Sequence, residues 1–240
     1  KGLSLLAEHN FCPTKKSKEN LLREGISNNK ISVVGNTIVD AIKHFKVQLK
    51  KHTFSSINLQ KKQNILNDEN IKKILLTMHR RENHQRGIEQ VCSAINKLTS
   101  DLQVHIFFPI HPNPNVKKVV ETIFKANRKV TLLEPLTYFD LLKLMNTADL
   151  VLSDSGGLQE ESPSFNKPIL VLRDSTERPE IIDAGGGLLV GTNEDKVYNV
   201  TREILENKKK YKEMSGIKNP FGDGNTSMRI INKIKSINEK

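Results

Sequence analysis

Leu150-Val151-Leu152-Ser153-Asp154-Ser155-Gly156-Gly157 joins an apolar run to a serine and two glycines, and Leu158-Gln159-Glu160-Glu161 follow directly. The apolar run predicts a short buried strand, and a helix is expected to begin near Glu160 and to stop at Pro163. A turn between a strand and a helix presents backbone N–H groups and a positive helix end to an anion, and glycines let a phosphate come close. Ser-Gly-Gly is also common in ordinary tight turns, so both interpretations stay open for this stretch alone.

The rest of the chain alternates apolar runs with helical patterns. Continuous runs predict strands that are covered on both faces, and apolar residues three and four apart predict helices between them. The predicted strands are 74–78, 104–110, 130–133, 150–153, 169–172 and 188–190, and the predicted helices include 88–98, 116–123 and 139–148. This alternation indicates an α/β protein, with a Rossmann-like parallel sheet and helices on both faces, over residues 74–218.

Three segments flank this predicted domain. Residues 1–42 are expected to form a strand, a helix and a strand, which is too little for a sheet with its own core. We therefore expect residues 1–42 to be poorly anchored or to pair with another chain. Residues 43–73 predict a connecting helix and loop, and residues 219–240 predict a closing loop and a C-terminal helix.

The composition argues against several classes of protein. No apolar run reaches the roughly 18 residues of a membrane span, so no membrane partner is expected. The net charge of +11 invites a nucleic-acid partner, but the lysines are spread out and lack interleaved aromatic residues, which favours solvated helix faces. Cys12 and Cys92 are far apart with no CxxC or histidine partner, which indicates a reducing compartment, the cytoplasm, and no zinc site.

Charged residues follow the predicted strands at the edge where open α/β sheets bind ligands. His79-Arg80-Arg81-Glu82-Asn83 follows strand 74–78, and His111 follows strand 104–110. A histidine beside arginines suits a phosphate or a leaving group, although a salt-bridged loop would have the same sequence. A further loop, residues 173–180, follows strand 169–172. Together these loops predict an anion site at one edge of the sheet.

These pieces, in this order, resemble the non-hydrolysing UDP-N-acetylglucosamine 2-epimerases. The resemblance runs from about residue 8 to residue 232. It implies the second domain of a glycosyltransferase-B type fold, so residues 1–42 would be the end of the first domain. The chain is then a fragment, or its partner half lies on another chain. The matching motifs are Phe11-Cys12-Pro13-Thr14, Gly35-Asn36-Thr37, His79-Arg80-Arg81-Glu82-Asn83, His111-Pro112-Asn113-Pro114, residues 154–161, residues 173–180, and Asn219-Pro220-Phe221-Gly222-Asp223-Gly224.

The resemblance implies an isomerase that interconverts UDP-N-acetylglucosamine and UDP-N-acetylmannosamine by eliminating UDP and adding it back. It also implies no cofactor and no metal, and we expect a homodimer. The first-domain carboxylates around the sugar are missing, so the isolated chain is expected to be inactive. The implied roles are leaving-group stabilisation for His79, pyrophosphate binding for Ser155, Gly156 and Gly157, ribose binding by an ionised Glu161, uracil contact for Pro135 and Leu136, UDP contact for Arg80 and Arg178, and a regulatory substrate site with Arg80 and His111.

The sequence leaves other interpretations open for several residues and for the whole chain. Glu161 is also readable as an ordinary helix N-terminal charge, and Glu177-Arg178 as a structural ion pair. Glu82 is expected to orient His79, and the paired arginines to favour its neutral form. The sequence Ala184-Gly185-Gly186-Gly187 departs from the family's usual Ala-Gly-Thr, which puts one hydroxyl near the nucleotide in doubt. For the whole chain, the alternatives are a non-catalytic UDP-sugar module, a hydrolysing epimerase, and a glycosyltransferase of similar architecture.

Overall fold

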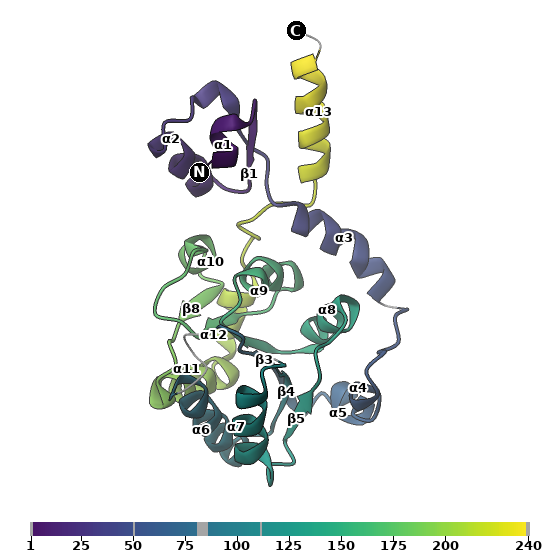
Figure 1. The fold of residues 1–240 in the computed structure, drawn as a ribbon. Helices are drawn as coiled ribbons and strands as arrows, with labels where there is room; N and C mark the ends of the chain where they lie inside the picture. Colours follow the sequence, from purple (N-terminus) through teal and green to yellow (C-terminus); the bar gives the residue numbers. More distant parts are fainter. Residues whose placement is uncertain (1, 50, 81–85, 111, 239–240) are drawn as a thin grey trace. The chain divides into compact units, whose positions relative to one another are not determined.

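The chain folds into two compact units, which are described separately. The computed structural model describes residues 2–49, 51–80, 86–110 and 112–238. The larger unit spans Leu49–Ile217, and the smaller unit combines Lys1–Gln48 with Lys218–Lys240 (Figure 1).

The larger unit is built on a six-stranded parallel sheet. Its strands follow the apolar runs of the sequence to within two residues, because each run is long enough to be buried on both faces. The order along the sheet is β5-β4-β3-β6-β7-β8, so the chain winds outward in both directions from the pair β3 and β6. The strands are β3 (Lys72–Thr77), β4 (Val104–Pro109), β5 (Val130–Leu133), β6 (Leu150–Ser153), β7 (Ile169–Val171) and β8 (Gly187–Leu189).

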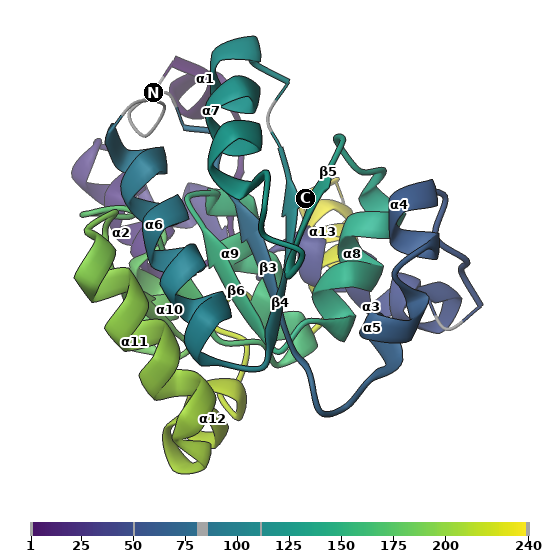
Figure 2. The same ribbon diagram turned by 90° about the horizontal axis from the view of Figure 1, so that it is seen from below.

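Both faces of this sheet are covered, as the sequence predicts. On one face, Ile74 and Leu76 of β3 belong to a core cluster that includes buried residues of α6, α7 and α11. Their neighbour Leu75 has no exposed surface either, and it points to the opposite face because side chains alternate along a strand. Helix α6 packs beside α7 and α11 (Figure 2). The long helices are α6 (Arg86–Asp101), α7 (Pro114–Phe124), α8 (Tyr138–Thr147), α11 (Glu194–Glu206) and α12 (Lys208–Ser215).

The short helix after β6 begins earlier than the sequence predicts. Helix α9 spans Gly156–Glu161, whereas we expected a start near Glu160. Ser155 is its N-cap and accepts a hydrogen bond from the Leu158 N–H group, so the helix can start directly after the serine. A 3₁₀ turn, Ser162–Phe165, follows. The other short helices of this unit are α4 (Ile57–Gln60), α5 (Gln63–Asn67) and α10 (Pro179–Asp183).

The smaller unit contains the predicted strand, helix and strand, followed by the long helix α3. Strands β1 and β2 pair in parallel, and a small cluster around Cys12 and Ile31 packs beneath them. The expected boundary after residue 42 falls inside α3. The elements are α1 (Gly2–Leu6), β1 (Asn10–Cys12), α2 (Lys15–Arg23), the 3₁₀ turn η1 (Asn28–Lys30), β2 (Ile31–Val33), α3 (Thr37–Leu49) and α13 (Thr226–Asn238).

The C-terminal segment packs within this smaller unit. The Asn36 N–H group donates to the carbonyl of Phe221 at 2.7 Å. Asp40 accepts hydrogen bonds from the N–H groups of Thr226 and Ser227, so a side chain of α3 caps the start of α13. These contacts join residues that are more than 180 positions apart in the sequence.

Two further features of the chain are its cysteines and the apolar character of its helices. Cys12 and Cys92 are both free thiols and both buried, as their isolation in the sequence predicts. In the part of the chain that the structure describes, no helix has both the length and the apolar character required to cross a bilayer.

Candidate functional site

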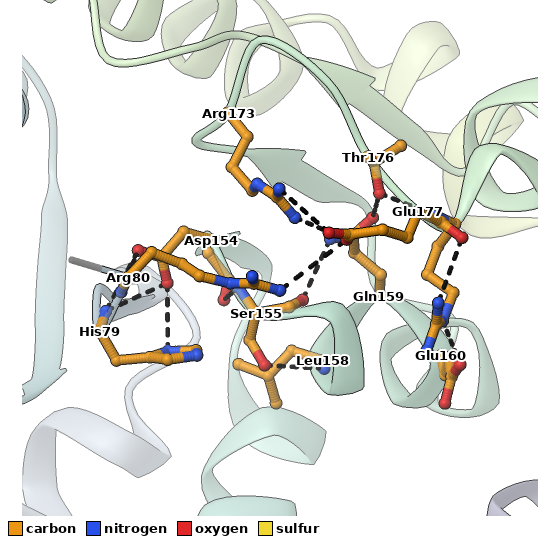
Figure 3. Close-up of polar contacts among 12 residues, drawn as sticks. His79, Arg80, Asp154, Ser155, Leu158, Gln159, Glu160, Arg173, Thr176 and Glu177 are labelled. Carbon is orange, nitrogen blue, oxygen red and sulfur yellow. Dashed lines mark hydrogen bonds and ion pairs between the residues drawn. The ribbon is translucent and has the colours of Figure 1, made fainter. Parts of the chain in front are cut away.

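The predicted site residues lie where the winding direction of the sheet changes. His79 and Arg80 follow β3, and Asp154 and Ser155 follow β6, its direct neighbour. Parallel strands end at the same edge, and doubly wound sheets bind ligands outside the carboxyl ends at this point. Arg173 and the residues up to Arg178 follow β7, the next strand (Figure 3). The structure thus brings together three of the loops that the sequence singles out.

Asp154 is the centre of the contacts around His79. Its carboxylate has no exposed surface, and it accepts hydrogen bonds from the backbone N–H groups of His79 (3.1 Å) and Arg80 (2.9 Å). His79 Nδ1 lies 3.1 Å from Asp154 Oδ1 (Figure 3). The hydrogen bond with Asp154 raises the pKa of His79, and burial and Arg80 oppose this by less.

This result corrects one expectation about His79. The sequence predicts a neutral ring beside paired arginines, but the buried carboxylate of Asp154 outweighs Arg80 and favours the imidazolium. The expected partner Glu82 lies outside the described residues, and Asp154 is the acidic partner that the structure shows. The sequence motif contains Asp154 but does not indicate that it contacts His79, because 75 positions separate the two residues.

The Ser155-Gly156-Gly157 turn has the geometry that the sequence predicts. The Ser155 N–H group donates to Ser153 Oγ at 2.9 Å, which fixes the turn to the end of β6. A side chain at Gly156 would meet nothing within 4 Å, and one at Gly157 would meet only Ser155 Oγ at 3.6 Å. There is therefore room beside both glycines for another molecule. Helix α9 has only six residues, so backbone N–H groups matter more here than the helix dipole.

Glu161 is buried at the C-terminal end of α9. This position excludes the alternative that it is an ordinary helix N-terminal charge. Its carboxylate accepts a hydrogen bond from the Tyr138 hydroxyl at 3.1 Å. Burial raises the pKa of Glu161 to about 7, and the Tyr138 hydrogen bond opposes that rise. In the ligand-free protein the Glu161 carboxyl therefore keeps its proton to a higher pH than the expected ionised carboxylate would.

Pro135 and Leu136 line a surface hollow of about 460 Å³. Its opposite wall comes from residues 55–58 of the connecting segment, which the sequence did not connect with the site. Asp140 holds this segment in place: it accepts hydrogen bonds from the Ser55 hydroxyl (2.6 Å) and from the Ser56 N–H group (2.9 Å). The lining residues are Ser55, Ser56, Ile57, Asn58, Glu134, Pro135, Leu136, Thr137 and Asp140.

Charged residues of the loop after β7 form ion pairs within the protein. Glu177 pairs with Arg173 through two hydrogen bonds of 2.7 and 3.2 Å, and Arg80 lies 3.8 Å from the same carboxylate. Arg173 holds the pKa of Glu177 low, at about 2. Arg178 pairs with Glu160 of α9 instead of with Glu177. Glu177 and Arg178 therefore each form an ion pair within the protein, but not with each other, and Arg178 holds its loop against helix α9.

The remaining positions that the sequence singles out are His111 and Gly186. His111 lies outside the described residues, so a site formed by Arg80 and His111 stays a prediction. Gly186 stands where the family usually has threonine, and a side chain there would come within 2.3 Å of Ile217 and 2.9 Å of Ile181. In this chain the two isoleucines fill the space of the absent hydroxyl. Among the described residues, no cluster of His, Cys, Asp and Glu is suited to a metal ion.

Known structures resemble the whole described fold. The UDP-N-acetylglucosamine 2-epimerase of Neisseria meningitidis, solved with UDP-N-acetylglucosamine bound, matches with a TM-score of 0.87 and 39% identity over 97% of this chain and 62% of its own. The enzyme of Methanocaldococcus jannaschii, solved with UDP-N-acetylglucosamine and UDP, matches with a TM-score of 0.77 and 35% identity over 96% and 61%. The protein is therefore an α/β protein with a Rossmann-like sheet of the glycosyltransferase-B type.

The sequence comparisons narrow this class to one family. The family profile of UDP-N-acetylglucosamine 2-epimerase matches residues 2–235, and the epimerase of Yersinia pestis is 41% identical over 232 residues. The chain belongs to the UDP-N-acetylglucosamine 2-epimerase family. It covers 61% of the length of the Yersinia pestis relative, which itself matches 96% of the chain.

Proposed function

We propose that this chain carries the UDP-binding half of a UDP-N-acetylglucosamine 2-epimerase, an isomerase that forms UDP-N-acetylmannosamine. The supporting observation is the Ser155-Gly156-Gly157 turn, which lies next to His79 and Arg80 at the point where the sheet changes its winding direction. Backbone N–H groups, an arginine and a histidine with a raised pKa suit a diphosphate. The family relatives solved with UDP-N-acetylglucosamine support the same ligand.

Each part of UDP has a matching group in this proposal. Ser155, Gly156 and Gly157 hold the pyrophosphate, with Arg80 as a neighbouring charge. Glu161 accepts hydrogen bonds from the ribose hydroxyls in place of the Tyr138 hydroxyl. The uracil lies in the hollow beside Pro135 and Leu136. Arg178 acts indirectly, because its contact is with Glu160 of α9.

The proposed chemistry places negative charge on the diphosphate. A base removes the proton from C2, the C2–H electron pair forms a C1=C2 double bond, and the bond between C1 and the glycosidic oxygen breaks. That oxygen leaves with the electron pair of the broken bond, and the β-phosphate gains charge. His79 in its imidazolium form would stabilise that charge or donate a proton to the oxygen. Re-addition of UDP after C2 has gained a proton on its other face would complete the epimerisation. The groups described here thus serve the leaving group rather than C2.

The assignment of the rest of the protein is also a proposal. We infer that residues 1–42 correspond to the end of a first Rossmann-like domain, and that groups acting at C2 come from such a domain. The isolated 240 residues should then bind UDP without forming UDP-N-acetylmannosamine. A homodimer and a cytoplasmic location fit this proposal. The exposed apolar side chains of Leu3, Leu5 and Leu6 favour association of two copies of the chain. Sedimentation measurements would detect such a dimer.

Calorimetric titration with UDP tests the binding site. Ser155→Ala and Glu161→Ala should each weaken binding about tenfold, which corresponds to about 1.4 kcal/mol. Ser100→Ala and Glu206→Ala are matched controls, because both residues are exposed on other helices, α6 and α11. Thermal unfolding of every variant separates lost affinity from lost stability. Unchanged UDP affinity in the Ser155→Ala/Glu161→Ala double variant would disprove the assignment.

A non-catalytic UDP-sugar module is the second candidate function, because the groups assigned above serve UDP rather than C2 of the sugar. Incubation with UDP-N-acetylglucosamine, with and without a separately supplied first domain, distinguishes the two: epimerisation only with the added domain supports the enzyme. The hydrolysing alternative is not favoured, since the two solved relatives named above are UDP-N-acetylglucosamine 2-epimerases with UDP-N-acetylglucosamine bound.

A further inference from the structure

We propose that Asp154 is the positioning residue of His79: it fixes the orientation of the imidazole ring and keeps a proton on Nδ1. Only the consequence for catalysis rests on the proposed function. The arrangement itself follows from the contacts of one buried carboxylate.

The register of the sheet explains why Asp154 reaches His79. Thr77 and Ser153 are paired at the ends of β3 and β6. Asp154 is the next residue after β6, and the chain after β3 turns so that the N–H groups of two successive residues point at its carboxylate. Asp154 thus accepts the backbone donors that β3 leaves at its end, as well as the donor on the ring. A sheet edge of this kind supports a side chain more rigidly than a loop does.

The chemistry of the carboxylate decides the position of the proton. An ionised carboxylate is an acceptor only, so the ring nitrogen that faces it must carry a proton. The nitrogen 3.1 Å from Asp154 is Nδ1, and Nε2 is therefore the nitrogen that gains or loses a proton when the ring titrates. Among the described residues, Asp154 raises the pKa of His79 and Arg80 lowers it.

The position of this proton matters for the proposed reaction. A ring that holds Nδ1–H against Asp154 turns Nε2 in the opposite direction, so contact with a departing diphosphate would be made by Nε2. The carboxylate also stabilises the imidazolium that such a contact needs. Without Asp154, the ring could rotate and exchange the roles of its two nitrogens.

The substitution Asp154→Asn changes these roles without changing the size of the side chain. The amide has one oxygen and one NH₂ group, and its oxygen is needed by the backbone donors of His79 and Arg80. The NH₂ group would then face the ring, which makes Nδ1 an acceptor and transfers the proton to Nε2. Asp154→Asn should therefore reverse the neutral tautomer of His79 and lower its pKa.

Nitrogen-15 NMR of the histidine rings, recorded over a pH titration, measures both quantities. In the unsubstituted chain above the pKa of His79, the ring should carry its proton on Nδ1, and this part needs no variant. Asp149→Asn is a matched control: Asp149 lies at the other end of the same strand and accepts the Lys73 N–H group of β3 at 2.8 Å. It should leave the His79 tautomer unchanged.

The outcomes separate the inference from the proposed function. A neutral His79 with its proton on Nε2 in the unsubstituted chain overturns the role of Asp154. So does a tautomer that is the same in Asp154→Asn and in Asp149→Asn, because a purely structural carboxylate predicts that result. If the tautomer reverses as expected but the chain does not bind UDP, the positioning role stands and the proposed function fails.

Discussion

Replacing Glu161 by glutamine should stabilise the ligand-free protein at pH 8. Glu161 is 8% exposed, and burial raises its pKa from the ordinary 4.5 to about 7. Between these pH values the folded protein keeps a proton that the unfolded chain has lost. The folded state therefore loses stability as the pH rises through this range, and the loss is complete above the folded pKa.

The size of the effect follows from the width of the range. A difference of about 2.5 units of pH, at about 1.4 kcal/mol each, gives about 3 kcal/mol at pH 8. Glutamine carries no charge, and its oxygen can still accept the Tyr138 hydroxyl. Glu161→Gln should therefore be more stable than the unsubstituted chain by up to about 3 kcal/mol at pH 8, and equal to it near pH 4.

Urea unfolding at pH 4, 6 and 8 measures this difference. Glu206→Gln is the control, because Glu206 is an exposed carboxylate of α11 whose charge is paired with Arg202, and its loss should not stabilise the protein. Saturating UDP should stabilise the unsubstituted chain more than Glu161→Gln. Equal stability of Glu161→Gln and the unsubstituted chain at pH 8 would refute the argument from burial.

Further predictions concern the scaffold. Gly186→Ala should lower the free energy of unfolding by about 1–3 kcal/mol in thermal melts, because the new methyl group meets Ile217. Asp140→Ala should cost about 2 kcal/mol or more and speed hydrogen exchange at residues 55–56, whose donors lose their acceptor. Burial raises the pKa of Cys92 to about 12, so a thiol reagent at pH 8 should modify it only after unfolding. Amide exchange in β1 and β2 should be faster than in β3 and β6, since only a small cluster packs beneath them.

The positions of most strands and helices could be predicted from the sequence, because they depend on local patterns of apolar residues. A run such as 150–152 is apolar at every position, and only a strand covered on both faces buries all of it. Ser155 and the two glycines similarly predict a turn from their own backbone preferences. The sequence predicts the start of α9 too late, because the hydrogen bond from the Leu158 N–H group to Ser155 Oγ lets the helix begin at Gly156.

The ion pairs and hydrogen bonds between side chains of the site could not be predicted from local sequence patterns. Arg178 is next to Glu177 in the sequence but pairs with Glu160, because the loop after β7 folds back onto α9. Tyr138 reaches Glu161 from the start of another helix, and its contact together with burial sets the charge of that carboxylate. Such contacts depend on which elements become neighbours, and many pairings are compatible with one pattern of charges.

The amino-acid order alone determined the α/β class, the sites of the turns and the set of polar residues at the strand ends, because these follow from local burial and backbone geometry. The tertiary structure decided the order of the strands, and with it the meeting of β3 and β6 that brings Asp154 to His79. Hydrophobic burial is not directional, so it drives collapse without selecting which residues meet. A hydrogen bond to a buried carboxylate, in contrast, requires donors within about 3 Å. That proximity exists only once the sheet has formed.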